Sequence, residues 1–169
     1  SILGEELRAQ NCIQSNNSEV IGDVWKFDSL TLSKRVQYVE DGISIKGGMQ
    51  INYKIVYPVS VPDNLSLKEV QGIFIRTFLG EENFTGTVKE AFNRLLEEYS
   101  GAEECGAGSD DYGYEDTRIL HIFTNTQNLL TVAFSTSEYT GGAHGLFGVS
   151  YLSIDKRNGT TVTEKTLFK

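Results

Sequence analysis

The stretch from Met49 to Tyr57 alternates apolar and polar side chains more clearly than any other part of the chain. Its apolar positions would share one face of a strand: Met49, Ile51, Tyr53, Ile55 and Tyr57. Such period-two alternation predicts a strand in a sheet with one buried and one wet face, which is typical of antiparallel sheets. Because proline cannot donate to a ladder, Pro58 and Pro62 are expected to end this strand.

Two amphipathic helices are predicted after this strand. Ser66 with Glu69, and Thr87 with Glu90, form capping-box patterns that begin the two helices, and Gly80 can end the first. Apolar residues then recur at helical spacing, at Leu67, Val70, Phe74 and Phe78 and at Val88, Ala91, Phe92, Leu95, Leu96 and Tyr99. Both stripes are expected to pack against the sheet.

Strands predominate again in the last third of the chain. Residues 119–124 and 129–136 are predicted to form a hairpin through a polar turn. A further strand over 147–154 carries apolar side chains on both faces, so we expect it to be buried on both sides or bulged. The Asn-Gly pair at 158–159 predicts a turn into a short strand at 160–163.

This order of elements predicts an α+β fold, an antiparallel sheet (a meander of strands) with two helices packed on one face. Residues 1–22 are expected to form a tail or linker, 23–116 the N-terminal strands with the two helices, and 117–169 the strand meander. At 169 residues the chain can bury a core without metals or disulfides, and we expect one compact unit.

The charge and cysteine content restrict the function classes. A net charge of −8 argues against a nucleic-acid partner and favours a basic protein, although solubility alone would also account for it. No stretch approaches the roughly 18 apolar residues that span a membrane. Cys12 and Cys105 could form one disulfide or remain two unrelated thiols, and their spacing fits no zinc pattern.

The segment from Ser137 to Gly145 is the most informative for function, because it places three glycines and a histidine between two predicted strands. The ring of His144 could meet a ligand at the end of the sheet, or it could hydrogen-bond the backbone and lock an unusual turn. The flanking rings could form an aromatic platform or belong to the core. The predicted binding surface comprises Tyr139, Gly141, Gly142, His144, Gly145 and Phe147.

Catalytic patterns are not evident. No G-x-S-x-G motif presents a serine, no H-E-x-x-H motif holds a zinc, and no glycine-rich loop cradles a phosphate before a helix. His144 is the better candidate base, because His121 lies inside a strand with apolar neighbours. The acidic residues of 106–116 do not follow a calcium-loop spacing, so a solvated loop is expected. We therefore predict no catalytic residue, no metal site and no cofactor.

The glycine-histidine segment also carries a resemblance. Residues 139–145 (Tyr-Thr-Gly-Gly-Ala-His-Gly), a strand, 153–159 and 163–168 resemble a bacterial domain of unknown function. That domain occurs in the extracytoplasmic part of the lysozyme-sensing anti-sigma factor RsiV, beside the catalytic domain of a peptidoglycan deacetylase, and in Bacteroidetes lipoproteins. Residues 25–29 and the strand ending in Tyr57-Pro58 resemble the companion domain that usually precedes it.

The resemblance implies an α+β protein of the periplasm or another extracytoplasmic location, which a removed leader could anchor by lipid. It implies no cofactor and transfers no catalytic residue. We expect a non-catalytic envelope module that recognises a basic protein (lysozyme-like) or a cell-wall glycan. Two alternatives remain: a hydrolase of cell-wall material that uses His144 with an acid from 110–116, and a purely structural lipoprotein domain.

Overall fold

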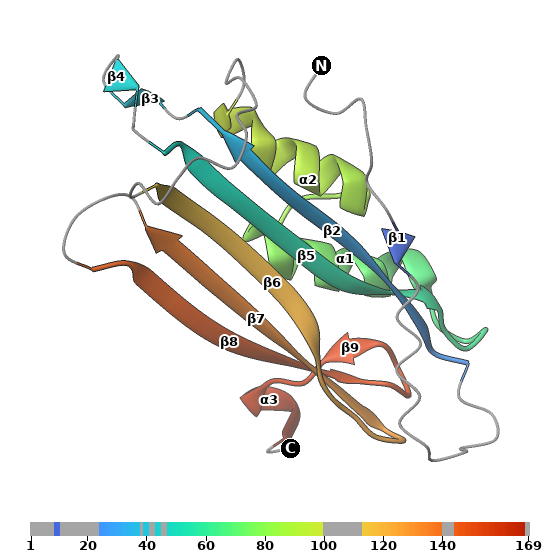
Figure 1. The fold of residues 1–169 in the computed structure, drawn as a ribbon. Helices are drawn as coiled ribbons and strands as arrows, with labels where there is room; N and C mark the ends of the chain where they lie inside the picture. Colours follow the sequence, from blue (N-terminus) through green and yellow to red (C-terminus); the bar gives the residue numbers. More distant parts are fainter. Residues whose placement is uncertain are drawn as a thin grey trace.

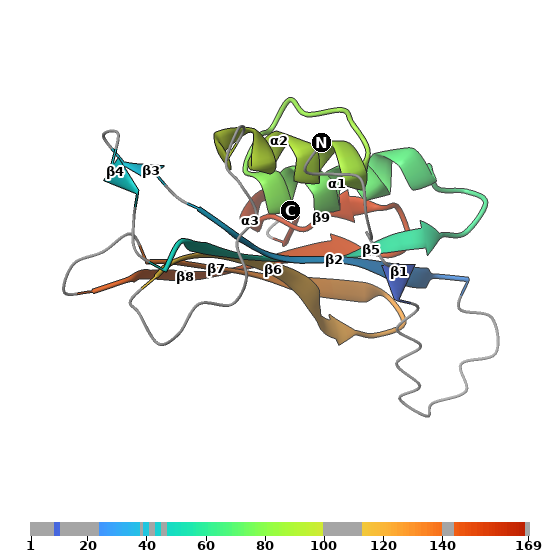
Figure 2. The same cartoon turned by 45° about the horizontal axis from the view of Figure 1, so that its top comes forward.

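The computed structural model describes residues 9–10, 24–37, 39–40, 43–44, 47–99, 113–139 and 144–167. They form a seven-stranded sheet in the order β1-β2-β5-β6-β7-β8-β9 and a separate two-stranded β3-β4 hairpin. Among these residues, helices cover one face of the sheet and leave the other open (Figures 1 and 2), which confirms the predicted α+β class. The strands are β1 (Ala9–Gln10), β2 (Lys26–Val36), β3 (Val39–Glu40), β4 (Ile43–Ser44), β5 (Met49–Ser60), β6 (Tyr114–Asn125), β7 (Leu129–Tyr139), β8 (Leu146–Asp155) and β9 (Thr160–Thr161). The helices are α1 (Leu67–Leu79), α2 (Val88–Leu96) and α3 (Glu164–Leu167), and a 3-10 turn at Glu97–Tyr99 follows α2.

The sheet consists of two antiparallel parts joined by one parallel pair. Strands β2 and β5 pair antiparallel, as do β6 with β7 and β7 with β8. Between the two parts, Met49–Ile55 of β5 runs parallel to Tyr114–Leu120 of β6. Parallel neighbours require a long crossover, and here the crossover contains α1 and α2. The expected boundary between 116 and 117 falls inside β6, and one buried cluster includes residues from both parts.

The predicted caps begin both helices. The Ser66 hydroxyl accepts a hydrogen bond from the Glu69 backbone at 3.3 Å. Thr87 and Glu90 form a reciprocal capping box, and Gly80 ends α1 in the left-handed conformation with φ 76°. Most residues of the two predicted apolar stripes are buried in α1 and α2, so both stripes face the sheet.

An aromatic cluster lies between the helices and the sheet. The rings of Phe78 and Phe92 stack with centroids 5.3 Å apart, and Tyr53 of β5 meets them edge-on at 6.4 and 6.0 Å. All three side chains are at most 1% exposed. The apolar face predicted for Met49–Tyr57 therefore forms the centre of the core.

Two local expectations are wrong. Pro58 does not end β5, which continues to Ser60. Among the described residues, β5 does not pair with β6 beyond Ile55, so a residue without an N–H costs no ladder bond on that side. Asp116 does not lie in a solvated loop: it is the third residue of β6, and it is buried beneath the helical layer.

Within the expected N-terminal tail, Ala9 and Gln10 pair with Leu30 and Ser29 of β2. The predicted short strand at 160–163 is β9, followed by the four-residue helix α3. Cys12 and Cys105 lie outside the described residues.

Candidate functional site

The open face of β6, β7 and β8 is the candidate functional site. On the helix-covered face of these strands, Leu120, Val132 and Ile154 have no exposed surface. Because side chains alternate along a strand, the neighbouring positions point to the open face. The strand register places Phe147 beside Ser137, Val149 beside Ser135, and Tyr151 beside Ala133 on that face.

Four apolar side chains form an exposed row here, which we call the aromatic strip. Phe123 is 58% exposed, Phe147 75%, Val149 45% and Tyr151 60%. The rings of Phe123 and Tyr151 meet edge-on with centroids 5.1 Å apart. At about 3.3 Å per residue, Phe147 and Tyr151 lie roughly 13 Å apart along β8, so a ligand that contacts both must be extended.

Hydroxyl groups lie beside the aromatic strip. Ser135 and Ser137 of β7 are half-buried on the same face. Thr131 and Ser153 share a hydrogen bond of 2.8 Å between their hydroxyls, and the Thr117 hydroxyl donates to Glu115 Oε1 at 2.8 Å. The surface therefore combines apolar rings with short polar groups that can donate and accept hydrogen bonds.

The predicted binding residues have different positions relative to this surface. Tyr139 shares the open face with Phe147 and packs against Tyr114 at a centroid distance of 6.5 Å. His144 is exposed just before β8. A Cβ added to Gly145 would come within 3.0 Å of the Glu138 carbonyl oxygen, so the backbone passes close there. Gly141 and Gly142 lie outside the described residues, and the role of this loop stays a prediction.

The expectation that β8 is buried on both sides, or bulged, is wrong. Its residues from Leu146 to Tyr151 are exposed, and its pairing with β7 is continuous. The physical reason is the position of the helices: α1 contacts β5 and β6, whereas β8 lies at the far margin of the sheet (Figure 1). Nothing in the described part of the chain covers the first two thirds of this strand.

Phe123, Val149 and Tyr151 were not among the predicted site residues. A signal for the latter two was present, because Phe147, Val149 and Tyr151 alternate with the small Gly148 and Ser150. Alternation assigns these side chains to one face but does not distinguish a core face from an exposed one. Phe123 lies within the register shift between Ile122 and Thr124, which sequence alone does not reveal.

A second polar cluster lies on the helix-covered face. The buried Asp116 carboxylate accepts hydrogen bonds from the hydroxyls of Tyr53 and Tyr99, the latter at 3.0 Å. Arg118 Nε lies 3.9 Å from Asp116 Oδ1. Burial, followed by the negative charge of Asp116, raises the pKa of both tyrosine hydroxyls well above the usual value. These tyrosines therefore remain neutral donors that stabilise a buried carboxylate.

This cluster bears on the hydrolase alternative. Asp116 is committed to the interior and is not a free acid for His144, while Asp110 and Asp111 lie outside the described residues. Glu115, the neighbouring acid, lies on the open face. His121 is also exposed on that face, opposite Ala133. Within the described residues, no hydrogen bond or ion pair joins either histidine to a carboxylate.

The described residues contain no group of three or more His, Cys, Asp or Glu side chains placed to hold a metal ion. In the same part of the chain, no helix has the length and apolar character needed to cross a membrane.

The fold has relatives among solved structures. A DUF3298 family protein from Bacteroides fragilis superposes with a TM-score of 0.61 at 22% identity, covering 85% of this chain and 61% of that one. A DUF3298 family protein from Pseudomonas aeruginosa gives 0.51 at 17% identity, covering 82% of this chain and 56% of that one. The chain thus shares the fold of these proteins and spans about three fifths of their length. No protein-family model and no curated protein matches it.

Proposed function

We propose that this chain is a non-catalytic module of the cell envelope whose open face binds a cell-wall glycan. The observation that carries the proposal is the aromatic strip: three rings and a valine are exposed side by side on a sheet face. Contiguous exposed apolar surface on a soluble domain is typical of interaction sites. The extracytoplasmic location, with attachment through a lipidated leader, rests on the sequence resemblance.

The chemistry of this surface suits a carbohydrate. Sugar rings have apolar faces that pack on aromatic rings, and their hydroxyls pair with serine and threonine hydroxyls. On the open face of β7, Ser135 and Ser137 lie directly beside Val149 and Phe147. A polysaccharide is extended, as contact with rings about 13 Å apart requires.

A basic protein such as lysozyme is the second candidate, and a different observation favours it. The chain carries a net charge of −8, and exposed carboxylates gather around the helical layer. They include Glu69, Glu81, Glu82, Glu90, Glu97 and Glu98. Complementary charge speeds the encounter with a cationic partner and makes its binding sensitive to salt. The two candidates therefore use opposite faces of the molecule.

The test for the glycan is the binding of soluble peptidoglycan fragments by isothermal titration. Phe147→Ala and Tyr151→Ala should each weaken binding at least fivefold while the protein stays folded. Ile43→Ala is the matched control, because Ile43 is 68% exposed on the separate β3-β4 hairpin. Equal effects of all three substitutions, or no binding by the unmodified chain, would refute the glycan proposal.

The test for the basic protein is lysozyme binding at low and moderate salt. Glu82→Gln with Glu98→Gln should weaken it. The control pair Thr31→Lys with Ser33→Lys makes the same change in net charge on the open face of β2, where both residues are exposed. If both pairs weaken binding equally, only the overall charge matters and the helical layer is not the site.

The same samples test the two remaining alternatives. Release of new fragments by the unmodified chain, lost in a folded His144→Ala variant, would establish a hydrolase and overturn the non-catalytic proposal. No binding to either ligand, with a His144→Ala variant that only melts earlier, would favour a structural domain.

A further inference from the structure

Strand β8 has a free outer edge. On its inner side it pairs with β7 along its whole length, while on its outer side β9 pairs only with Ile154 and Asp155. The Val162 backbone N–H also reaches the Ser153 carbonyl at 2.8 Å. Among the described residues, nothing pairs with this edge from Leu146 to Leu152. Figure 1 shows β8 at the margin of the sheet, opposite β2.

The contact at Ser153 fixes which backbone groups point outward. Since the Ser153 carbonyl faces β9, and since strand backbone groups alternate, those of Phe147, Val149 and Tyr151 also point away from β7. These three residues also carry the side chains of the aromatic strip. The free edge thus offers N–H and C=O groups at alternate residues whose side chains all lie on the open face.

The usual protections of an edge strand are missing here. Exposed edges in soluble proteins commonly carry charges, prolines or bulges that prevent pairing with another strand. The sequence from Leu146 to Ile154 contains no charged residue and no proline, and its register with β7 is regular. Such an edge is competent to add another strand.

The free stretch is also complementary to itself. Its midpoint is Val149, so a second copy running antiparallel about a two-fold axis there would place Val149 opposite Val149. Phe147 would then lie opposite Tyr151, Gly148 opposite Ser150, and Leu146 opposite Leu152. Rings would meet rings, small residues would meet small residues, and no like charges would face each other.

We propose that two copies of this chain associate through antiparallel pairing of their β8 edges, centred on Val149. The pairs Val149–Val149 and Phe147–Tyr151 would exchange the outward-pointing hydrogen bonds. The two sheets would continue into each other with both helical layers on the same side. The two aromatic strips would then adjoin on one open face. The inference does not depend on the identity of the ligand.

The size of the contact sets the expected affinity. An aromatic side chain contributes about 150–250 Å², so the edge residues bury at most a few hundred Å² per copy. A standard interface buries roughly 800 Å² per partner. The net charge of −8 opposes association further. We therefore expect a weak dimer with Kd on the order of 0.1 mM, tightened as salt screens the repulsion.

Sedimentation equilibrium of the full chain without ligand, from about 10 µM to 1 mM, tests the proposal. Val149→Lys places two ammonium groups opposite each other and should raise Kd at least tenfold. Ser135→Lys is the matched control, because it adds the same charge to the same face one strand inside the edge. Because it reduces the magnitude of the net negative charge, it should leave Kd unchanged or slightly lower.

A second variant probes the backbone instead of the charge. Val149→Pro removes an outward N–H and leaves the β7 ladder intact, so it should also raise Kd at least tenfold. Circular dichroism and thermal melting must show that the variant tested is folded. A strictly monomeric chain at 1 mM would overturn the proposal. So would a dimer that a folded Val149→Lys or Val149→Pro variant leaves intact, or one that Ser135→Lys weakens equally.

Discussion

The two faces of the sheet carry the same kinds of side chain in opposite environments. On the covered face, Tyr53 is 1% exposed and Phe92 of α2 is fully buried against it. On the open face, Phe147 is 75% exposed and Tyr151 60%. In the sequence, both groups belong to regular apolar patterns, which are alternation in the strands and helical spacing in α2. The comparison teaches that alternation assigns a side chain to a face, whereas the layer above that face decides whether it joins the core.

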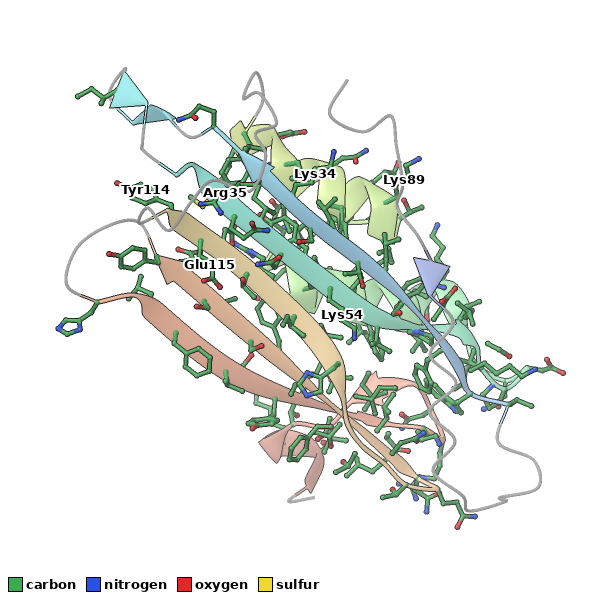
Figure 3. All side chains as sticks on the ribbon, in the orientation of Figure 1. Lys34, Arg35, Lys54, Lys89, Tyr114 and Glu115 are labelled. Atoms are coloured by element: carbon green, nitrogen blue, oxygen red, sulfur yellow. The ribbon has the colours of Figure 1, made fainter. Side chains whose placement is uncertain are left out.

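The open face itself divides into two parts. On β2 and β5 it is polar: the Ser33 hydroxyl donates to Asn52 Oδ1 at 2.8 Å, and Gln50 Nε2 reaches both side chains at 3.3 Å. On β6 to β8 it carries the aromatic strip. Figure 3 shows Arg35, Lys54 and Glu115 on this face, with Arg35 and Lys54 on β2 and β5. A polar face satisfies its own hydrogen bonds, while an apolar one is stabilised by contact with a partner.

The largest expected effect is in the covered cluster. Phe92→Ala should lower the free energy of unfolding by about 3–5 kcal/mol, because it leaves a cavity between Phe78 and Tyr53 that the sheet cannot fill. Chemical denaturation would measure this. A loss below about 1 kcal/mol would mean that the helical layer is not packed as described.

A smaller loss is expected when the buried carboxylate loses one donor. Tyr53→Phe should cost about 1–3 kcal/mol near neutral pH, since Asp116 keeps only the Tyr99 hydroxyl as its tyrosine donor.

Tyr53→Phe should also change how the free energy of unfolding depends on pH. Because the folded protein holds the tyrosine protons above the usual pKa of 10, stability is fully present below pH 10 and is lost as pH rises further. Each such tyrosine contributes a slope of about 1.4 kcal/mol per pH unit, so Tyr53→Phe should flatten the decline. Chemical denaturation of both proteins at several pH values above 10 would measure the two slopes.

A third effect concerns a buried cation at the end of the sheet remote from the glycine-histidine loop. Lys156 is 5% exposed, and its Nζ donates to Asn125 Oδ1 at 2.9 Å and to the Thr126 carbonyl at 3.0 Å. It also lies 5.8 Å from the Trp25 ring centroid. Lys156→Met keeps the apolar stem and should cost about 1 kcal/mol in thermal denaturation, because water can replace the bonds to the exposed turn. No change would show that the stem alone matters.

The smallest effect should occur on the open face. Phe147→Ala should change the free energy of unfolding by less than about 0.5 kcal/mol, because the ring is already exposed in the monomer. Measured at low concentration beside Phe92→Ala, it isolates the contribution of the helical layer. A loss approaching that of Phe92→Ala would place Phe147 in a core and remove the basis of the candidate site.

Local patterns predicted much of the fold. The capping residues Ser66 and Thr87 marked the starts of α1 and α2, and the polar turn at 125–128 gave the β6–β7 hairpin. These signals act over a few residues, where sequence directly restricts conformation. The α+β class followed from the order of elements.

Features that depend on distant residues could not be predicted. The parallel pairing of β5 with β6 joins segments separated by both helices. The burial of Asp116 depends on Tyr53 and Tyr99, which come from a strand and a 3-10 turn elsewhere in the chain. For the candidate site, the sequence indicated Tyr139 and Phe147, but the exposure of Val149 and Tyr151 depends on which face of the sheet the helices cover.

The parallel junction between β5 and β6 has a consequence for the order of folding. The meander of β6, β7 and β8 forms through short turns, so its contacts close small loops quickly. Pairing Met49–Ile55 with Tyr114–Leu120 instead closes a loop that contains both helices, at a greater entropic cost. We therefore expect the meander to assemble early and the β5–β6 ladder to form late. Until the core is complete, the apolar edge of β8 is already formed and can pair with another refolding chain. The yield of native protein should therefore depend on the concentration of refolding chains.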